Sequence, residues 1–286
     1  MKKVLVTGAG GYIGSHLCSV LFNSGLYHVT ALDLNFSRNE VSAHEKVVDD
    51  VRMFTADEDY DAVVHLAGLI SVEESNSEPL SYYDVNMNGT INMLAQTKGT
   101  HFIFASTAGA FDPISPYAKS KVAAEDIIRQ VCSSYTIFRF FNVAGSDGIH
   151  HQIGKATHLI RIASEVATGK RQMMQVFGTD YDTRDGSCVR DYIHVLDLVN
   201  TIAATIEAGP QCTPYECLGT GTGSTTLEVI ETMRKVTGKQ LWATHAPRRP
   251  GDPATLALDG KYHLMQTKYT LEDICLSAYE IEGKLI

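Results

Sequence analysis

Apolar residues in the first half of the chain form short continuous runs that alternate with longer stretches of helical spacing. The continuous runs, each expected to form a buried strand, cover residues 4–6, 29–32, 62–66, 101–105 and 136–140. The stretches with apolar side chains three and four positions apart, each expected to form a helix, cover residues 12–24, 79–96 and 116–131. Strands without a polar face that alternate with helices are typical of a parallel sheet covered on both sides.

This pattern predicts an α/β fold, a doubly wound parallel sheet of the Rossmann type, over residues 1–145. The chain has 286 residues, which is enough for a second domain. We expect residues 146–286 to form mainly a smaller substrate-binding domain. Because domains interleave in such folds, we expect some of its segments to return to the first domain.

Hydrophobic residues make up 44% of the chain and charged residues 20%, which is ordinary for a globular protein. The formal net charge of −9 has the wrong sign for a non-specific nucleic-acid binder, so any phosphate site must be local. No apolar run approaches the roughly 18–20 residues of a membrane span, so we expect no membrane segment. Six cysteines without a CxxC pair indicate a cytoplasmic, reducing compartment, and the histidines lack the spacing of a metal site.

Glycines at positions 8, 11 and 14 stand between the first expected strand and the first expected helix. Glycine is needed where a chain turns tightly, approaches a pyrophosphate closely, or packs a helix against a strand. Asp33 ends the second expected strand 19 residues after Gly14, where a carboxylate binds both ribose hydroxyls of NAD and repels a 2′-phosphate. The turn therefore predicts an NAD site, and the alternative is a structural turn beside a surface aspartate.

Tyr117 and Lys121 are four residues apart on an expected helix, so they share one of its faces. A phenol is a poor base at neutral pH, but a neighbouring ammonium group and an oxidised nicotinamide both favour its ionised form. The pair follows a strand that ends at Thr107, at the carboxyl edge where such sheets bind ligands. We expect a catalytic tyrosine here, and the alternative is an exposed helical pair without a catalytic role.

In this order, the nucleotide turn, Thr107 and the Tyr117–Lys121 pair resemble the extended short-chain dehydrogenase/reductase family, and within it the UDP-glucose 4-epimerases. Further similar stretches extend nearly to the end of the chain and read VVHLAGL, PLSYYDVNMNGT, RFFNVAG, QVFGTDYDTRDGSCVRDYIHVLDL, APRRPGDPATL and YTLEDI. The longest of them is the most specific, because a generic nicotinamide enzyme has no need of it.

The resemblance implies an NAD site and a set of catalytic residues. The implied cofactor-binding residues are Gly8, Gly11, Tyr12, Ile13, Gly14, Asp33, Asp50, Val51, Leu66, Ala67, Gly68, Tyr117, Lys121 and Phe141. By the same resemblance, Tyr117 takes the proton of the C4 hydroxyl of a UDP-hexose, Lys121 keeps the tyrosine ionised, and Thr107 positions the hydroxyl. The implied reaction is redox-neutral, because the hydride that leaves C4 returns to the other face of a transient 4-keto sugar.

The resemblance also implies a UDP-sugar site. Its implied residues are Thr107, Tyr117, Asn142, His158, Leu159, Gln175, Val176, Phe177, Arg190, Arg249, Asp252 and Leu256. Arginine suits a diphosphate because its planar fork pairs with phosphate oxygens, although surface salt bridges are the alternative for both arginines. Leu256 stands where a bulky side chain excludes N-acetylated sugars in some relatives. We therefore expect UDP-galactose and UDP-glucose as substrates, and UDP-GalNAc and UDP-GlcNAc stay open.

Two other functions also stay open. The first is a catalytically silent NAD(H)-binding regulatory protein, which the retained Tyr117–Lys121 pair disfavours. The second is a nucleotide-sugar 4-ketoreductase that uses NADPH, which Asp33 disfavours. Dehydration of the sugar is a poorer expectation, because Ala108 and Gly109 follow Thr107 where dehydratases have an acidic pair.

Several positions depart from the family pattern on the side that binds adenosine. Ile70 stands where many relatives have a lysine near the NAD phosphates, and Val85 replaces an asparagine. Only 17 residues separate Asp33 from Asp50, and residues 52–60 leave little room for a helix. We predict weaker retention of NAD than in typical relatives. The helices that contain residues 82–94 and 117–131 form a two-fold interface in relatives, which implies a homodimer.

Overall fold

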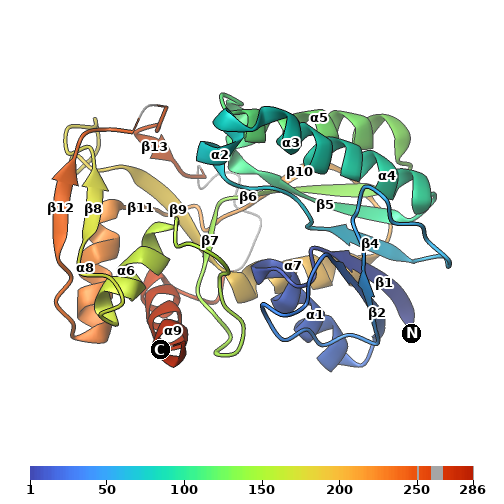
Figure 1. Cartoon of the computed structure of the whole chain (residues 1–286), viewed down its shortest axis with the longest axis horizontal. Helices are drawn as coiled ribbons and strands as arrows, with labels where there is room; N and C mark the ends of the chain where they lie inside the picture. Colours follow the sequence, from blue (N-terminus) through green and yellow to red (C-terminus); the bar gives the residue numbers. More distant parts are fainter. Residues whose placement is uncertain (250, 259–266, 286) are drawn as a thin grey trace. The chain divides into compact units, whose positions relative to one another are not determined.

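The computed structural model describes residues 1–249, 251–258 and 267–285, and it divides into two compact units (Figure 1). Unit 1 comprises Met1–Phe140 and Val199–Glu216, and unit 2 comprises Phe141–Leu198 and Cys217–Ile286. The first crossing falls at Phe140, and the segment Val199–Glu216 returns to unit 1. This segment contains most of one helix of unit 1 and most of one edge strand of its sheet.

Unit 1 is built on a seven-stranded sheet in the part of the chain that the structure describes. Its strands are β1 (Lys2–Thr7), β2 (Tyr27–Asp33), β3 (Glu45–Val48), β4 (Ala62–His65), β5 (His101–Thr107), β6 (Tyr135–Phe140) and β10 (Cys212–Leu218). The spatial order is β10-β6-β5-β4-β1-β2-β3, and the pairs from β6 to β3 are parallel. The order reverses between β1 and β4, which is where doubly wound sheets bind their ligands.

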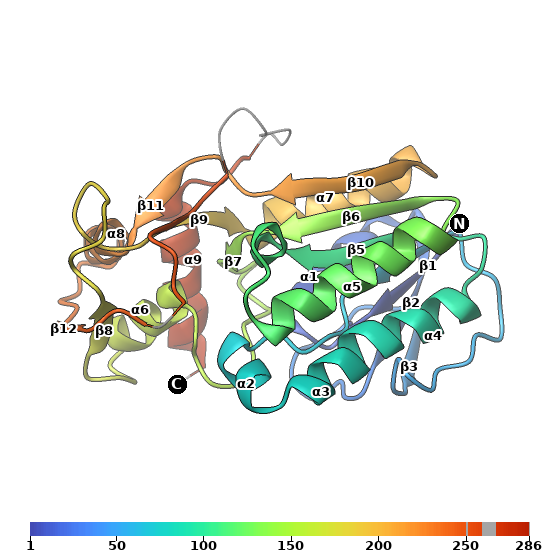
Figure 2. The ribbon, with the colours of Figure 1, turned by 90° about the horizontal axis from the view of Figure 1, so that it is seen from above.

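Helices cover both faces of this sheet (Figures 1 and 2). Those on one side are α2 (Val72–Ser77), α3 (Pro79–Tyr83), α4 (Gly89–Gln96) and α5 (Pro116–Val131), and those on the other are α1 (Tyr12–Ser24) and α7 (Val195–Ala208). A π-helical turn, η1 (Asp84–Asn88), joins α3 to α4, and a short 3-10 helix, η2 (Ala108–Phe111), follows β5. Large apolar side chains such as Leu5, Phe102 and Ile137 are fully buried in the layer between the sheet and α4–α5.

The structure confirms the predicted doubly wound fold, and several predicted elements match to the residue. The helices at 12–24 and 116–131 have the predicted bounds, while the run at 79–96 is one helical path interrupted by η1. Residues 52–60, all of them described, form turns and no helix, as their short length predicts. The pattern did not reveal β3 and α2, because both are short and rich in charged or polar residues.

Unit 2 contains two small sheets and three packed helices among its described residues. The larger sheet has the order β11-β9-β13, with β7 paired to β9, and the smaller sheet pairs β12 with β8. Its strands are β7 (Asn142–Ala144), β8 (Met174–Phe177), β9 (Val189–His194), β11 (Gly223–Thr225), β12 (Ala243–Ala246) and β13 (Thr255–Leu256). Its helices are α6 (Leu159–Ala167), α8 (Thr226–Thr237) and α9 (Leu271–Lys284), which share a core that includes Ile160, Met233 and Ile274.

To cross a lipid bilayer, a helix needs about 20 predominantly apolar residues. None of the helices in the described part of the chain is both long enough and apolar enough to do so.

Candidate active site

The predicted glycine turn connects β1 to α1. Gly8 has a positive φ of 67°, and a β-carbon there would lie 2.7 Å from the backbone nitrogen of Ala67. A β-carbon at Gly14 would overlap the carbonyl oxygen of Gly8, so helix and turn can only meet this closely at glycine. Gly11 is the N-cap of α1, and no side chain caps the helix. The first-turn amide groups, which include those of Tyr12 and Ile13, suit a phosphate.

Asp33 is held in place at the end of β2 by backbone amides. One carboxylate oxygen accepts a hydrogen bond from the Gly10 nitrogen at 2.9 Å, and the other accepts one from the Asn35 nitrogen at 3.1 Å. Each carboxylate oxygen can accept a second hydrogen bond, so a ribose diol can still bind. A side chain at Gly10 would overlap the carbonyl oxygen of Asn35, which makes Gly10 part of the same turn. Gly10 was not among the predicted residues of the NAD site. The turn, its uncapped helix and the fixed carboxylate together fit a dinucleotide such as NAD.

The residues implied for the adenosine side lie in a turn after β3. Asp50 accepts a hydrogen bond from the side chain of Arg52, which lowers the pKa of this carboxyl, and Arg52 also pairs with Asp84 at 2.5 Å. Val51 is buried in the core of unit 1 and would contact a β-carbon at Gly89. The carboxylate of Asp50 is therefore occupied within its own turn, and the side chain of Val51 belongs to the core of unit 1.

The segment after β4 approaches the glycine turn. The Leu66 nitrogen donates to the carbonyl oxygen of Thr7, and the Ala67 nitrogen donates to the Thr7 hydroxyl. Gly68 lies close to Lys121, because a β-carbon there would be 3.1 Å from the lysine Nζ. The structure thus brings the strand end, the glycine turn and the lysine of α5 together in unit 1.

The predicted catalytic residues meet where β5 ends and α5 begins. Pro116 opens α5, Ser115 caps it, and Tyr117 follows in its first turn. Thr107 ends β5, and its hydroxyl accepts a hydrogen bond from the Gly109 nitrogen at 3.1 Å. Lys121 is buried, and its Nζ donates to the carbonyl oxygen of Ala105 at 2.9 Å. The alternative of an exposed helical pair is wrong for Lys121.

Burial shifts the ionisation of both members of the pair. It raises the pKa of Tyr117, and a hydrogen bond with the side chain of Thr107 offsets part of this rise. It lowers the pKa of Lys121 to about 8, and the charge of Glu125 opposes that shift. The neighbouring His65, also buried, has its pKa lowered to about 3 and is neutral. The protein alone therefore favours a neutral phenol beside an ammonium group that is easily deprotonated.

Asn86 connects these elements, and the sequence analysis passed over it. Its buried amide accepts a hydrogen bond from the Leu69 nitrogen and donates to the Leu69 carbonyl oxygen and to the Ser120 hydroxyl. The residue lies in η1, whose wider turn holds it between the segment after β4 and α5. Val85, directly before it, replaces an asparagine of the family pattern, whereas Asn86 is retained. A retained asparagine beside a replaced one was the signal available in the sequence.

In unit 2, the three residues implied for the diphosphate and ribose, Arg190, Arg249 and Asp252, form one cluster with Phe177, which is implied for the uridine. The guanidinium carbon of Arg249 lies 3.8 Å from the centre of the Phe177 ring. The Asp252 nitrogen donates to the carbonyl oxygen of Arg249, and its carboxylate pairs with Arg190 at 3.3 Å. Arg190 also donates to the carbonyl oxygens of Val189 and Pro253. Both arginines keep donors for an anion, because a guanidinium group has five.

The other implied residues of unit 2 lie on several of its elements. They are His158 and Leu159 at the start of α6, Gln175 and Val176 on β8, Asn142 at the start of β7 with Phe141 directly before it, and Leu256 on β13. Leu256 is paired in register with Arg190 across β13 and β9. Val176 is buried in the core of unit 2, whereas Gln175 is exposed beside it.

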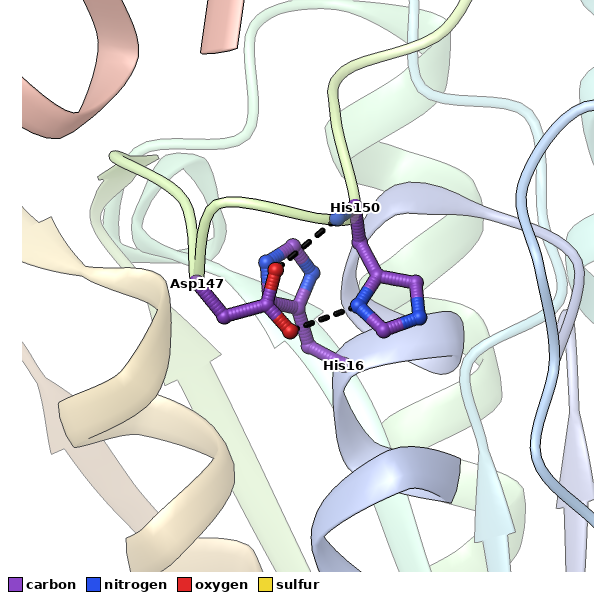
Figure 3. Close-up of side chains that lie close together, drawn as sticks. All are labelled: His16, Asp147 and His150. Carbon is purple, nitrogen blue, oxygen red and sulfur yellow. Dashed lines mark hydrogen bonds and ion pairs between the residues drawn. The ribbon is translucent and has the colours of Figure 1, made fainter. Parts of the chain in front are cut away.

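Two aspartates of unit 2 organise loops that sequence reasoning did not find. The buried Asp191 accepts hydrogen bonds from Thr220, Gly221 and Leu258, all distant in sequence, so no local pattern could reveal it. Asp147 binds the ring and the backbone nitrogen of His150, at 2.6 and 2.8 Å, and closes the turn after β7 (Figure 3). Both aspartates therefore have structural partners.

A model of the NAD dependent epimerase/dehydratase family matches residues 4–217, which is most of the chain. The chain belongs to this family. It is 37% identical to a UDP-glucose 4-epimerase of Azospirillum brasilense, over 89% of this chain and 83% of that protein. The predicted family and fold are therefore confirmed.

Solved structures of similar proteins cover both units. The UDP-glucose 4-epimerase of Bifidobacterium longum in complex with NAD⁺ and UDP has a TM-score of 0.88 at 31% identity, over 99% of this chain and 98% of that one. The UDP-Glc/GlcNAc 4-epimerase of Campylobacter jejuni has a TM-score of 0.81 at 33% identity, over 99% and 100%.

Proposed function

We propose that this protein is an NAD-dependent epimerase that interconverts UDP-galactose and UDP-glucose by inverting C4 of the sugar. The observation that carries the proposal is the corner of unit 1 where Tyr117, Thr107 and Lys121 converge. A phenol one helical turn from a buried ammonium group, near a threonine that lowers its pKa, can act as a general base once it is ionised. The 4-epimerases among its relatives support the same reaction class.

In the proposed mechanism, Tyr117 removes the proton of the C4 hydroxyl while the hydroxyl of Thr107 holds that oxygen. Burial keeps the free phenol protonated, so Tyr117 becomes a base only when positive charge lies beside it. Lys121 supplies one such charge from within the same helix. NAD, when bound, supplies a positively charged hydride acceptor that later returns the hydride, so the reaction is redox-neutral. In the second half, Tyr117 gives its proton back to the C4 oxygen.

Residues of unit 2 hold the part of the substrate that does not react. Arg190 and Arg249 would bind the diphosphate of UDP, and Phe177 and the start of α6 would contact the uridine. Binding energy from the nucleotide keeps the substrate in the site while the 4-keto sugar rotates between the two hydride transfers. An acidic protein can bind this anion because Asp252 links the two arginines on unit 2.

The direct test is to incubate the protein with UDP-galactose and NAD and to observe UDP-glucose by NMR. We expect both sugars at equilibrium with no net NADH. An absence of conversion at high protein concentration would remove the proposal and favour a silent NAD(H)-binding protein. Accumulation of NADH would instead identify a dehydrogenase.

We also propose that the protein retains NAD weakly and that it is a cytoplasmic homodimer. The weak retention is supported by the exposed Ile70, which offers no charge, and by Arg52, whose guanidinium is already paired with two aspartates. The dimer is supported by exposed apolar side chains on α3, α4 and α5, namely Leu80, Ile91 and Val131. Full NAD occupancy after purification without added cofactor would contradict the first proposal, and a monomer in sedimentation velocity the second.

A further inference from the structure

Glu125 is a buried carboxylate on α5 that the proposed mechanism does not use. It lies one turn after Lys121 and two turns after Tyr117, on the same face of the helix. Its side chain is 0% exposed. It accepts hydrogen bonds from Arg139 at 3.0 and 2.7 Å, from Arg129 at 2.6 Å and from Ser106 at 2.5 Å. A buried carboxylate is costly without such partners, so this network keeps Glu125 ionised.

Three consecutive residues at the end of β5 each interact with this face of α5. The carbonyl oxygen of Ala105 accepts from Lys121, and the hydroxyl of Ser106 donates to Glu125. The side chain of Thr107 lowers the pKa of Tyr117. The interactions of Ala105 and Thr107 therefore involve the proposed catalytic groups. Glu125 provides the interaction at Ser106, which lies between these two strand residues. Ser106, which bonds Glu125, directly precedes Thr107 in the strand.

Arg139 connects the same carboxylate to the loop that follows Thr107. Its guanidinium carbon lies 4.8 Å from the centre of the Phe111 ring and 4.3 Å from that of Tyr215. Phe111 is the last residue of η2, which begins immediately after Thr107. Two rings and a carboxylate thus orient this guanidinium. Glu125 is therefore linked to both ends of η2, to Ser106 two residues before its start and, through Arg139, to Phe111 at its end.

The charge of Glu125 also acts on Lys121. The groups that face this ammonium are Glu125 on its own helix, Tyr117 one turn earlier and the neutral His65 on β4. The Phe104 ring lies below it, with 4.8 Å between Nζ and the ring centre. Burial acts against the charged form of Lys121, and the carboxylate of Glu125 acts for it. Removing that carboxylate leaves the ammonium with a carbonyl group and a ring.

We propose that Glu125 is a positioning residue that keeps Lys121 charged and holds Thr107 against Tyr117. The inference rests on the proposed function for its effect on turnover. Its effect on the ionisation of Tyr117 does not, because a phenolate can be observed without any sugar substrate.

The test compares Glu125→Gln with Asp126→Asn, which removes a neighbouring exposed carboxylate that pairs with Arg129 at 3.0 Å. The first measurement is the pH at which the Tyr117 phenolate appears with NAD bound, from ultraviolet absorbance after subtracting the Tyr117→Phe form of each variant. We expect Glu125→Gln to move this midpoint up by about one pH unit, because a neutral lysine no longer supports the phenolate. We expect Asp126→Asn to leave the midpoint unchanged. Glu125→Asp, which keeps the negative charge, should move the midpoint by less than Glu125→Gln does.

The second measurement is turnover of UDP-galactose. We expect kcat of Glu125→Gln at neutral pH to fall at least tenfold with KM within about threefold, which is the result of lost positioning and charge rather than lost binding. If Glu125→Gln does not fold, Ser106→Ala takes its place, since it removes only one hydrogen bond to the carboxylate and should lower kcat several-fold.

The outcomes separate the two proposals. A lower melting temperature with an unchanged phenolate midpoint and unchanged kcat would show that Glu125 is only structural and would overturn the inference. A shifted midpoint in a protein whose wild type does not epimerise UDP-galactose would support the role of Glu125 and reject the proposed function.

Discussion

The two units hold their candidate functional groups in different ways. In unit 1, Lys121, Glu125 and Arg139 are buried, and each has hydrogen-bond partners inside the protein. In unit 2, Arg190 has a longer ion pair to a partly exposed Asp252, and Arg249 rests on an aromatic ring. The groups that support the proposed base are therefore fixed before any ligand arrives, whereas those proposed to bind the diphosphate keep spare donors. This difference suits a substrate that is held at one end and reacts at the other.

The largest effect should come from the fixed corner. We expect Tyr117→Phe to lower kcat for UDP-galactose by about 10³-fold, within the range of a lost general base. UDP binding, measured by calorimetry, should change less than threefold because unit 2 is untouched. A variant that retains a tenth of the activity would show that another group carries the proton.

Substitutions in the cluster of Arg190, Arg249 and Asp252 in unit 2 should instead affect KM more than kcat. We expect Arg249→Ala to raise KM for UDP-galactose about 10- to 100-fold, as for the loss of hydrogen bonds to a charged group, with kcat within threefold. Arg248→Ala is the matched control, because its exposed guanidinium pairs with Asp180 and lies against Tyr181. Equal effects of the two substitutions would reject the assignment of Arg249 to the diphosphate.

The fixed corner should also have a measurable cost in stability. The pKa of Lys121 is about 8 in the folded protein and near 10.5 in an unfolded chain, so the unfolded state binds more protons between these values and stability rises with pH in that window. We expect Lys121→Met to increase the free energy of unfolding at pH 7 by roughly 1–3 kcal/mol, allowing for the lost bond to Ala105. Urea denaturation at pH 7 and pH 10 measures this gain. It should shrink at pH 10, and the exposed Lys119→Met should show neither effect.

The smallest effect concerns the choice of sugar. Leu256 is of intermediate size and is paired with Arg190, so we expect slow conversion of UDP-GlcNAc by the wild type. Leu256→Tyr should reduce that activity about fivefold or more relative to UDP-glucose. An unchanged ratio of the two rates would exclude Leu256 as the residue that limits sugar size.

Sequence reasoning succeeded best where the interactions are local. The bounds of α1 and α5 follow from apolar spacing together with Gly11, Ser115 and Pro116 at their starts. The pattern missed α2, although Ser71 caps it three residues before Glu74, because its six residues have no apolar face. Family resemblance was needed for the residues of unit 2, since Arg190 and Arg249 are 59 positions apart.

Partners that are distant in sequence explain the remaining omissions. Glu125 stands at a helical spacing from Tyr117 and Lys121, but its partners Ser106 and Arg139 come from two different strands. Asp191 binds backbone groups 29 to 67 positions away. Neither network leaves a local signal, because the fold alone brings the partners together.

The π-helical turn at Asp84–Asn88 determines how this helical region can tolerate changes in length. A π-turn contains about one residue more than an α-helical turn, so it can lose one residue and remain helical. Because the extra residue lies within one turn, such a deletion would leave α3 and α4 in nearly the same orientation relative to each other. The Tyr82 ring, whose centre lies 6.3 Å from that of Tyr117, would keep its place. The deletion would instead remove the wider turn that holds Asn86 between the segment after β4 and α5.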